Sequence, residues 1–186
     1  MPALPSIPRF NSSKRGADFR LAAGFTALIF FSLYFTPFLR DFLSRHLLLG
    51  KFVSGFYVLF GLGLILLFLH KYQIRNPKAY LGFLVVFVLF LLELQITPMP
   101  VERLHFIEYA LLFAVWFRVL RHFFKGIGLY GAALWWVCLI GLLDEGIQKI
   151  LPNRHFDWDD IYLNVFGSLL GLASVWILMR YRRDRR

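Results

Sequence analysis

The stretch LLDEGIQKILPNRHFDWDDIYLN, Leu142 to Asn164, joins two apolar runs that are each long enough to cross a bilayer as a helix. A bilayer core needs about 20 residues of helix, with a range of about 17 to 25. The flanking runs, Gly128–Gln148 and Asp160–Met179, have that length. Because an ionisable group that reaches the bilayer core costs roughly 2.5 to 3.5 kcal/mol, acidic residues between such runs predict a polar site where the two helices meet.

Four more apolar runs precede this pair: Phe19–Thr36, Phe52–His70, Ala79–Gln95 and His105–Arg121. The chain is 59% hydrophobic, whereas ordinary soluble domains are about 45 to 50% apolar. No small-residue cleavage site follows the first run, so we expect a retained helix there rather than a cleaved signal peptide. The pattern predicts an all-α, polytopic membrane helix bundle with about six transmembrane helices.

The chain divides into one membrane domain and two short tails. We expect a cytoplasmic N-terminal tail at residues 1–18, a single membrane domain at 19–180 and a basic C-terminal tail at 181–186. The single cysteine, Cys138, excludes an intramolecular disulfide and a cysteine metal site. Its position in the middle of the fifth run indicates a small packing residue.

The basic residues predict how the chain is oriented. Of the 21 Lys and Arg residues, fifteen lie in the two tails and in the second and fourth connections. The remaining six lie on the opposite face: Arg40, Arg45, Lys51, Arg103, Lys149 and Arg154. The positive-inside rule then places both termini in the cytoplasm. The net charge of +10 is explained by attraction to anionic lipid headgroups. Each basic residue near the membrane surface gains about 1 kcal/mol of binding free energy from this attraction. We expect membrane lipids as partners and no nucleic acid.

A second polar stretch, PMPVERLHFIEY from Pro98 to Tyr109, falls on the same outer face as the first. All but two of the eleven acidic residues lie on this face; the exceptions are Asp18 and Asp184. Residues three and four apart share one side of a helix. Three polar faces are therefore predicted, with His105, Glu108 and Tyr109 on the fourth run, Asp144, Glu145 and Gln148 on the fifth, and Asp160, Asn164, Gly167 and Gly171 on the sixth. The glycine spacing lets another helix approach closely.

The residue types suggest both a chemical and a structural interpretation. His105 carries an imidazole that titrates near neutrality, so it is the natural general acid or base, with Glu108, Asp144 or Glu145 to orient it. Arg154 has the geometry to hold a phosphate or carboxylate. The structural alternatives are that His105 caps the start of its helix and that Arg154 pairs with an acidic neighbour.

Acidic residues also raise the question of a metal. Asp157, Asp159 and Asp160 with Glu145 would supply hard oxygen ligands for Mg²⁺ or Ca²⁺. The helix dipole favours the same aspartates at a helix start, so a divalent cation is compatible with the sequence but not favoured, and we assign no metal ligands. Glu93 lies deep in an apolar run and needs a partner, for which we expect His105 or Arg103.

Missing motifs narrow the function. The chain has no GxSxG, HExxH, P-loop or dinucleotide-binding fingerprint. The middles of the second and third runs are uncharged, which argues against a proton relay or an ion path across the bilayer.

The polar residues follow one another in a recognisable order. The succession His105-x-x-x-Tyr109, Asp144-Glu145-x-x-Gln148, Pro152-x-Arg154, Asp157-x-x-Asp160-x-x-x-Asn164-x-x-Gly167-x-x-x-Gly171 resembles the VanZ-like family of small bacterial membrane proteins over residues 79–180. That family takes its name from a teicoplanin-resistance protein. The resemblance implies a location in the bacterial cytoplasmic (inner) membrane, a role in the cell envelope and a shared polar site, but it supplies no reaction.

Two functions fit these observations. In the first, an outward-facing site binds or modifies a lipid-linked or glycopeptide-type amphiphile of the cell envelope. If it is catalytic, His105 would act with Glu145 or Asp144, and the binding residues would be Arg154, Tyr109, Gln148, Asp157, Asp160 and Asn164. In the second, the chain is a non-catalytic accessory subunit of a larger membrane complex, with apolar faces around Phe83, Phe87 and Phe90 for lipid or partner helices. Transport of a small amphiphile is a third alternative.

Overall fold

The chain folds into helices throughout the part that the computed structural model describes, namely residues 12–45, 49–67, 72–97, 103–151 and 156–182. These residues contain no strand. The helices are α1 (Ser12–Arg45), α2 (Leu49–Leu66), α3 (Pro77–Ile96), α4 (Arg103–Leu120), α5 (Gly126–Gln148) and α6 (Trp158–Tyr181). Each corresponds to one of the six apolar runs, so the all-α prediction is confirmed.

Three helices in the described ranges are long and apolar enough to cross a membrane. They are Ser13–Phe38 within α1, Gly126–Gln148 and Trp158–Tyr181. All three also expose large apolar side chains, for example Phe31 (59%), Trp135 (66%) and Trp176 (50%). An aqueous surface would not favour such residues in this density, whereas lipid tails solvate them.

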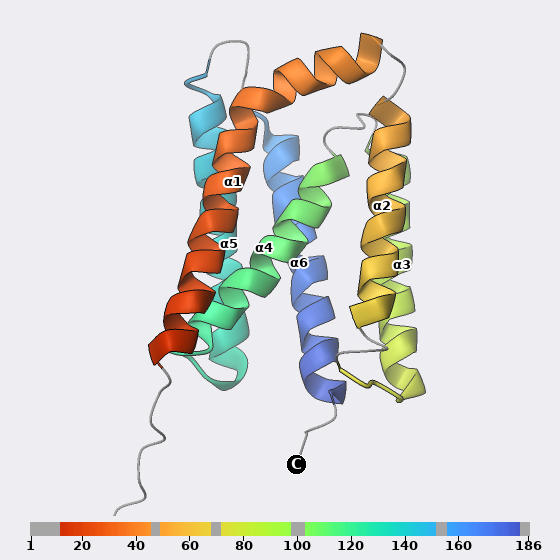
Figure 1. Cartoon of the computed structure of the whole chain (residues 1–186), viewed down its shortest axis with the longest axis vertical. Coiled ribbons are helices and arrows are strands. Elements are labelled where there is room, and N and C mark those ends of the chain that lie inside the picture. Colours follow the sequence, from red (N-terminus) through yellow and green to blue (C-terminus); the bar gives the residue numbers. More distant parts are fainter. Residues whose placement is uncertain (1–11, 46–48, 68–71, 98–102, 152–155, 183–186) are drawn as a thin grey trace, which may run out of the picture.

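Helix α1 extends beyond the predicted run Phe19–Thr36 at both ends. It continues through Pro37, which lies inside the helix, as far as Arg45. An interior proline removes one backbone hydrogen bond and clashes with the preceding turn, which bends a helix. In Figure 1 the last part of α1 runs across one end of the bundle, at a steep angle to the rest. Arg40 and Arg45, which follow the predicted run Phe19–Thr36, are therefore helical.

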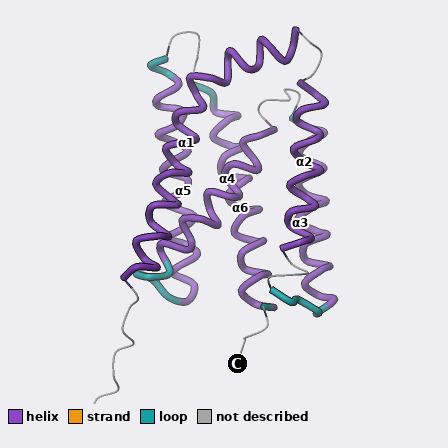
Figure 2. The backbone as a smooth tube through the Cα atoms, in the orientation of Figure 1, coloured by secondary structure: helices purple, strands orange, loops and turns teal. Residues whose placement is uncertain are grey.

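Helices α4 and α6 form the centre of the bundle. Figure 1 shows α4 crossing in front of α6, with α1 and α5 on one side and α2 and α3 on the other, and Figure 2 shows the same arrangement as a backbone tube. Helix α4 packs against α1, α5 and α6, and α6 packs against α3, α4 and α5. The side chains of Phe106, Leu112 and Phe113 of α4 are completely buried.

Two glycines of α6 allow this central contact. A Cβ atom added at Gly167 would lie 2.8 Å from the carbonyl oxygen of Phe106. One added at Gly171 would lie 2.6 Å from the carbonyl oxygen of Ala110. Small residues four apart let two helix backbones touch. The sequence predicts the close approach, and the structure shows that α4 is the helix that approaches.

The aromatic face expected on the third run is only partly exposed. Phe87 is 48% exposed, but Phe90 is buried. Phe90 packs edge-on against Tyr57 of α2 and Phe106 of α4, with ring centroids 5.0 and 6.3 Å away. The expectation that Phe90 offers a surface to lipid or partner helices is therefore wrong, because α2 and α4 cover it.

Candidate functional site

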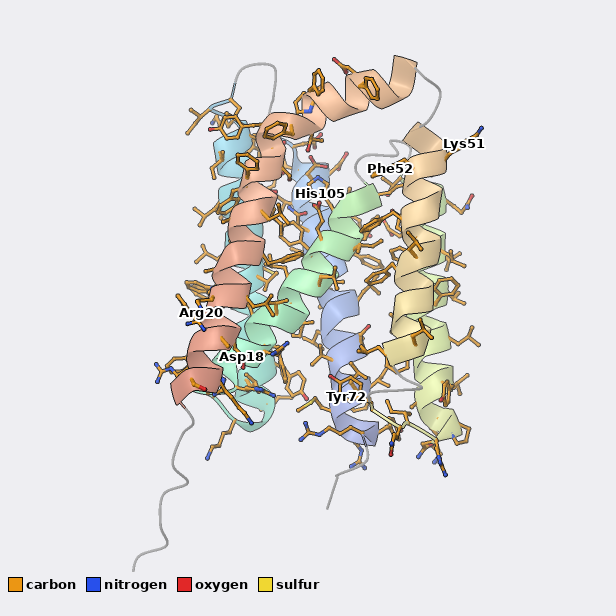
Figure 3. The ribbon with its side chains drawn as sticks, in the orientation of Figure 1. Asp18, Arg20, Lys51, Phe52, Tyr72 and His105 are labelled. Atoms are coloured by element: carbon orange, nitrogen blue, oxygen red, sulfur yellow. The ribbon has the colours of Figure 1, made fainter. Side chains whose placement is uncertain are left out.

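The polar cluster lies at the end of the bundle where α4 begins, α5 ends and α6 begins. In Figure 3 His105 lies at this end, whereas Asp18 lies at the opposite end. The α4–α6 contact brings together the first turns of these two helices, and α5 packs against both. Polar residues from three helices thereby become neighbours.

Tyr109 of α4 and Asp144 of α5 make a buried contact at the centre of the cluster. The Tyr109 hydroxyl donates a hydrogen bond to Asp144 Oδ2 at 3.1 Å. Both residues have no exposed surface. The second carboxylate oxygen of Asp144, Oδ1, is also buried and has no hydrogen-bond partner among the described residues. Asp144 is thus held by one oxygen and leaves the other available.

Glu145 connects the end of α5 to the start of α6. Its Oε1 accepts a hydrogen bond from the side-chain amide of Gln148 at 2.7 Å, and its Oε2 accepts one from the backbone N–H of Asp157 at 3.2 Å. The Asp157 side chain in turn accepts from the backbone N–H of Asp159 at 2.9 Å and so caps α6. Both oxygens of Glu145 are therefore occupied by bonds that position two helix ends.

His105 lies beside Tyr109, at the first turn of α4. Its ring is 6.3 Å from the ring of Tyr109, at an interplanar angle of 30°. The side chain is half-buried, yet Nδ1 is buried and has no hydrogen-bond partner in the described structure. The charges of four carboxylates act on the imidazole, those of Glu108, Asp160, Asp144 and Glu145. Among the described residues His105 makes no hydrogen bond to Glu145, one of the carboxylates expected to orient it.

Asn164 of α6 completes the cluster. It is 1% exposed. A Cβ atom added at Gly141 of α5 would lie 3.2 Å from Asn164 Cβ and 3.1 Å from a ring carbon of Tyr109, so these residues meet at one point of α5. Neither Oδ1 nor Nδ2 of Asn164 has a hydrogen-bond partner in the described part of the chain. Because both amide atoms are unpaired, the conclusion does not depend on which way the amide is turned.

Unpaired polar atoms are concentrated in this cluster. Within the described ranges, five buried side-chain nitrogen or oxygen atoms lack a hydrogen bond. Four of the five belong to His105, Asp144 and Asn164, and the fifth belongs to Trp136. A buried unpaired polar group costs about 1 to 3 kcal/mol, and more when it is charged. Such a concentration is typical of a place where another molecule supplies the missing partners.

The remaining predictions for the site concern two aspartates at the start of α6, a metal ion and an anion-binding arginine. Asp159 and Asp160 lie in the first turn of α6, where the helix dipole favours acidic residues. Among the described residues no group of three or more His, Cys, Asp or Glu side chains is arranged to hold a metal ion. Arg154, predicted as an anion-binding residue, lies outside the described residues.

Glu93 faces the interior, but its partner is not one of those expected. It is 5% exposed, and its Oε2 accepts a hydrogen bond from the Tyr162 hydroxyl of α6 at 3.5 Å. Arg103 instead donates its Nε–H to the carbonyl oxygen of Thr97 at 3.0 Å. The hydroxyl of Tyr57 donates to the carbonyl oxygen of Arg103. These bonds hold α2, α3, α6 and the start of α4 together beside the cluster.

A second polar group, which the sequence analysis did not predict, lies at the opposite end of the bundle. Asp18 of α1 is 3% exposed. It accepts hydrogen bonds from Arg118 at 2.5 Å and Arg121 at 3.4 Å, and its Oδ2 lies 3.0 Å from Nε2 of His122. Asp18 thereby ties the start of α1 to the end of α4. The sequence signal for it was the isolated acidic residue among the basic residues of the N-terminal tail.

Comparison with known proteins identifies the family. No curated protein and no solved structure matches the chain significantly. The family model described as VanZ/LLP1 matches residues 7–179. The match therefore reaches well before residue 79, where the motif resemblance begins, and includes the first two helices. Since it covers nearly all of the 186 residues, the chain belongs to the VanZ/LLP1 family.

Proposed function

We propose that the chain is a multi-pass protein of the bacterial inner membrane, with both termini in the cytoplasm and the polar cluster at the outer face. The uneven distribution of Lys and Arg supports this orientation. The start of α1 and the end of α6 lie at the same end of the bundle in Figure 1, opposite to the end of His105 in Figure 3.

Two cysteine variants test the orientation in a chain whose native cysteine is replaced, Cys138→Ala. Asp159 is exposed at the cluster end and Lys125 is exposed at the other end. In intact cells we expect a membrane-impermeant maleimide to label Asp159→Cys but not Lys125→Cys. If only Lys125→Cys is labelled, the chain has the opposite orientation, with both termini outside the cytoplasm.

The proposed function of the cluster is to bind the polar headgroup of a cell-envelope amphiphile. The observation that carries this proposal is the set of four buried, unpaired polar atoms on His105, Asp144 and Asn164. A bound headgroup would supply hydrogen bonds to these atoms and recover the free energy that their burial costs. His105, Glu108 and Asp160 are only half-buried, so the cluster extends to the surface of the bundle.

The same geometry supports a limited statement about chemistry. An imidazole close to several carboxylates is suited to moving a proton to or from a bound group. Asp144 is better placed than Glu145 to act with His105, because Asp144 Oδ1 is unpaired whereas both oxygens of Glu145 are occupied. Binding is the function that the geometry supports best, and proton transfer would be an addition to it.

The replacement Asn164→Leu tests the binding function. Leucine has a similar size and removes both unpaired atoms, so we expect the unliganded chain to be as stable as wild type or more stable. Native mass spectrometry of the purified chain with envelope lipid extract should show an adduct on wild type that is lost from Asn164→Leu. Glu93→Gln is the matched control, because Glu93 is buried but bonded to Tyr162 outside the cluster. An adduct retained by Asn164→Leu would contradict the proposal.

A second candidate function is a non-catalytic accessory subunit of a membrane complex. The specific observation in its favour is Glu145, whose two oxygens accept hydrogen bonds that pin the end of α5 to the start of α6. In this case the cluster maintains the helix ends rather than binding a ligand. Chemical cross-linking in native membranes, followed by purification, should then give a stoichiometric assembly with another membrane protein, and the adduct described above should be absent.

A further inference from the structure

We infer that the cluster recognises a protonated amine, an ammonium group carried by an envelope molecule, rather than a phosphate or a metal ion. This inference rests on the proposed binding function and names the chemical class of its ligand. It is carried by two separate observations, the charges around the cluster and the kind of atoms left unpaired.

The charges favour a cation. Glu108, Asp144 and Glu145 act electrostatically on the imidazole of His105. None of these three carboxylates makes an ion pair within the described part of the chain. Arg103, the basic residue that begins α4, donates its Nε–H to the carbonyl oxygen of Thr97 instead. A phosphate placed here would meet like charges, whereas a cation would meet complementary ones.

The unpaired atoms favour a ligand with several hydrogen-bond donors. Asp144 Oδ1 and Asn164 Oδ1 accept hydrogen bonds and cannot donate them when Asp144 is ionised. His105 Nδ1 accepts a hydrogen bond in one neutral tautomer. An ammonium group has three N–H donors and no acceptor, so it matches these three atoms. The fourth unpaired atom, Asn164 Nδ2, is a donor and requires an acceptor on another part of the same ligand. Asn164 is 1% exposed, which means that water at the surface does not satisfy its amide.

A metal ion is the other cation to consider. Mg²⁺ and Ca²⁺ take about six to eight oxygen ligands. The described residues contain no group of three or more His, Cys, Asp or Glu side chains that is arranged around one point to bind a metal. One free oxygen on Asp144 and one on Asn164 are too few for such an ion but sufficient for an ammonium group.

The first test compares lipid headgroups that differ at the amine. The full-length chain is reconstituted in nanodiscs that contain equal amounts of phosphatidylethanolamine, phosphatidylcholine and phosphatidylglycerol, then released and analysed by native mass spectrometry. Trimethylation keeps the charge of the amine but removes its N–H donors. The difference between phosphatidylethanolamine and phosphatidylcholine therefore measures the contribution of the hydrogen bonds separately from that of the charge. We expect phosphatidylethanolamine to be retained at least several-fold over the other two lipids.

An amine on a sugar is the other source of the same chemistry. A second arm measures the thermal unfolding of the chain with added glucosamine, and N-acetylglucosamine serves as the uncharged comparison. Stabilisation by glucosamine alone, without selective retention of phosphatidylethanolamine, supports the ammonium site and assigns it to an amino sugar. If neither amine is preferred over its comparison, the inference is overturned.

Variants separate this inference from the proposed function. Asp144→Asn removes the charge at nearly constant shape and should abolish the amine preference, whereas Glu93→Gln should preserve it. If Asp144→Asn does not fold, Glu108→Gln serves instead, because the Glu108 side chain makes no hydrogen bond in the described structure. This variant should only weaken the preference. Retention of phosphatidylglycerol that depends on Asn164 would overturn the amine inference but leave the binding function. If neither a lipid nor a sugar binds in a way that depends on Asn164, both the amine inference and the binding function are overturned.

Discussion

Replacing Gly171 by alanine places a methyl group against the backbone of α4. The added Cβ would lie 2.6 Å from the carbonyl oxygen of Ala110, 2.9 Å from its Cα and 3.0 Å from the Cβ of Phe113. Backbone atoms cannot rotate away as the end of a flexible side chain can. The two helices must therefore separate, and the packing of Phe113 in the core must change with them.

The size of the effect follows from two opposing contributions. Overpacking a well-packed core costs about 1 to 3 kcal/mol, and contact with backbone atoms places this site at the upper end. Alanine recovers about 0.5 to 1 kcal/mol because glycine is a poor helix former. The net loss in the free energy of unfolding is about 2 kcal/mol. For a chain of this size, that loss lowers the melting temperature by about 4 to 8 °C.

The assay is thermal unfolding of the purified chain in nanodiscs, with Gly131→Ala as the matched control. Gly131 lies on an exposed face of α5, and a Cβ atom added there meets nothing within 4 Å. Gly131→Ala should leave the stability unchanged or raise it by about 0.5 to 1 kcal/mol. If Gly171→Ala is as stable as Gly131→Ala, α4 and α6 do not pack through this glycine.

Three further substitutions probe the polar contacts, each measured by thermal unfolding in the same nanodiscs. Tyr109→Phe removes the hydrogen bond that the Tyr109 hydroxyl donates to Asp144 and should destabilise the fold by about 1 to 3 kcal/mol. No change in stability would mean that the bond is absent in the membrane. Glu145→Ala leaves an amide and a backbone N–H unpaired and should cost about 2 to 4 kcal/mol, clearly more than Tyr109→Phe. Asp18→Ala removes one carboxylate partner from Arg118, Arg121 and His122. Because Arg118 is 50% exposed, we expect a smaller loss of stability, about 1 to 2 kcal/mol, that shrinks as salt is added. A loss that is insensitive to salt would show that the charges do not matter there.

The helices were predictable because their signal is local. Each of the six helices contains an apolar run. Three of them are long and apolar enough to cross a bilayer, which leaves the backbone polar groups no partner except those within the helix. Helix α1 extends beyond its run, to Arg45 through Pro37. Residues after Pro37 are more polar, so hydropathy marks the end of the apolar segment and not the end of the backbone hydrogen bonds.

The cluster was predictable as a set of residues but not as a set of contacts. Helical spacing places Asp144 and Glu145 next to each other at the end of α5, and nothing in that spacing shows which of them is fully bonded. The structure gives Glu145 two hydrogen bonds and leaves one oxygen of Asp144 unpaired. For this reason Asp144, rather than Glu145, is the carboxylate that we propose to act with His105.

The sequence by itself determined the helical class, the approximate limits of the helices and the end of the bundle at which polar residues gather. All three depend on residues within a few turns of one another, through hydropathy and the 3.6-residue period. Only the tertiary structure decided that Glu93 meets Tyr162, 69 residues away, and that Asp18 meets Arg118, 100 residues away. Such pairs depend on how each helix is rotated about its axis and where it crosses its neighbours. Side-chain packing over the whole bundle sets both quantities, and the close approach of α6 to α4 at Gly167 and Gly171 is its clearest example.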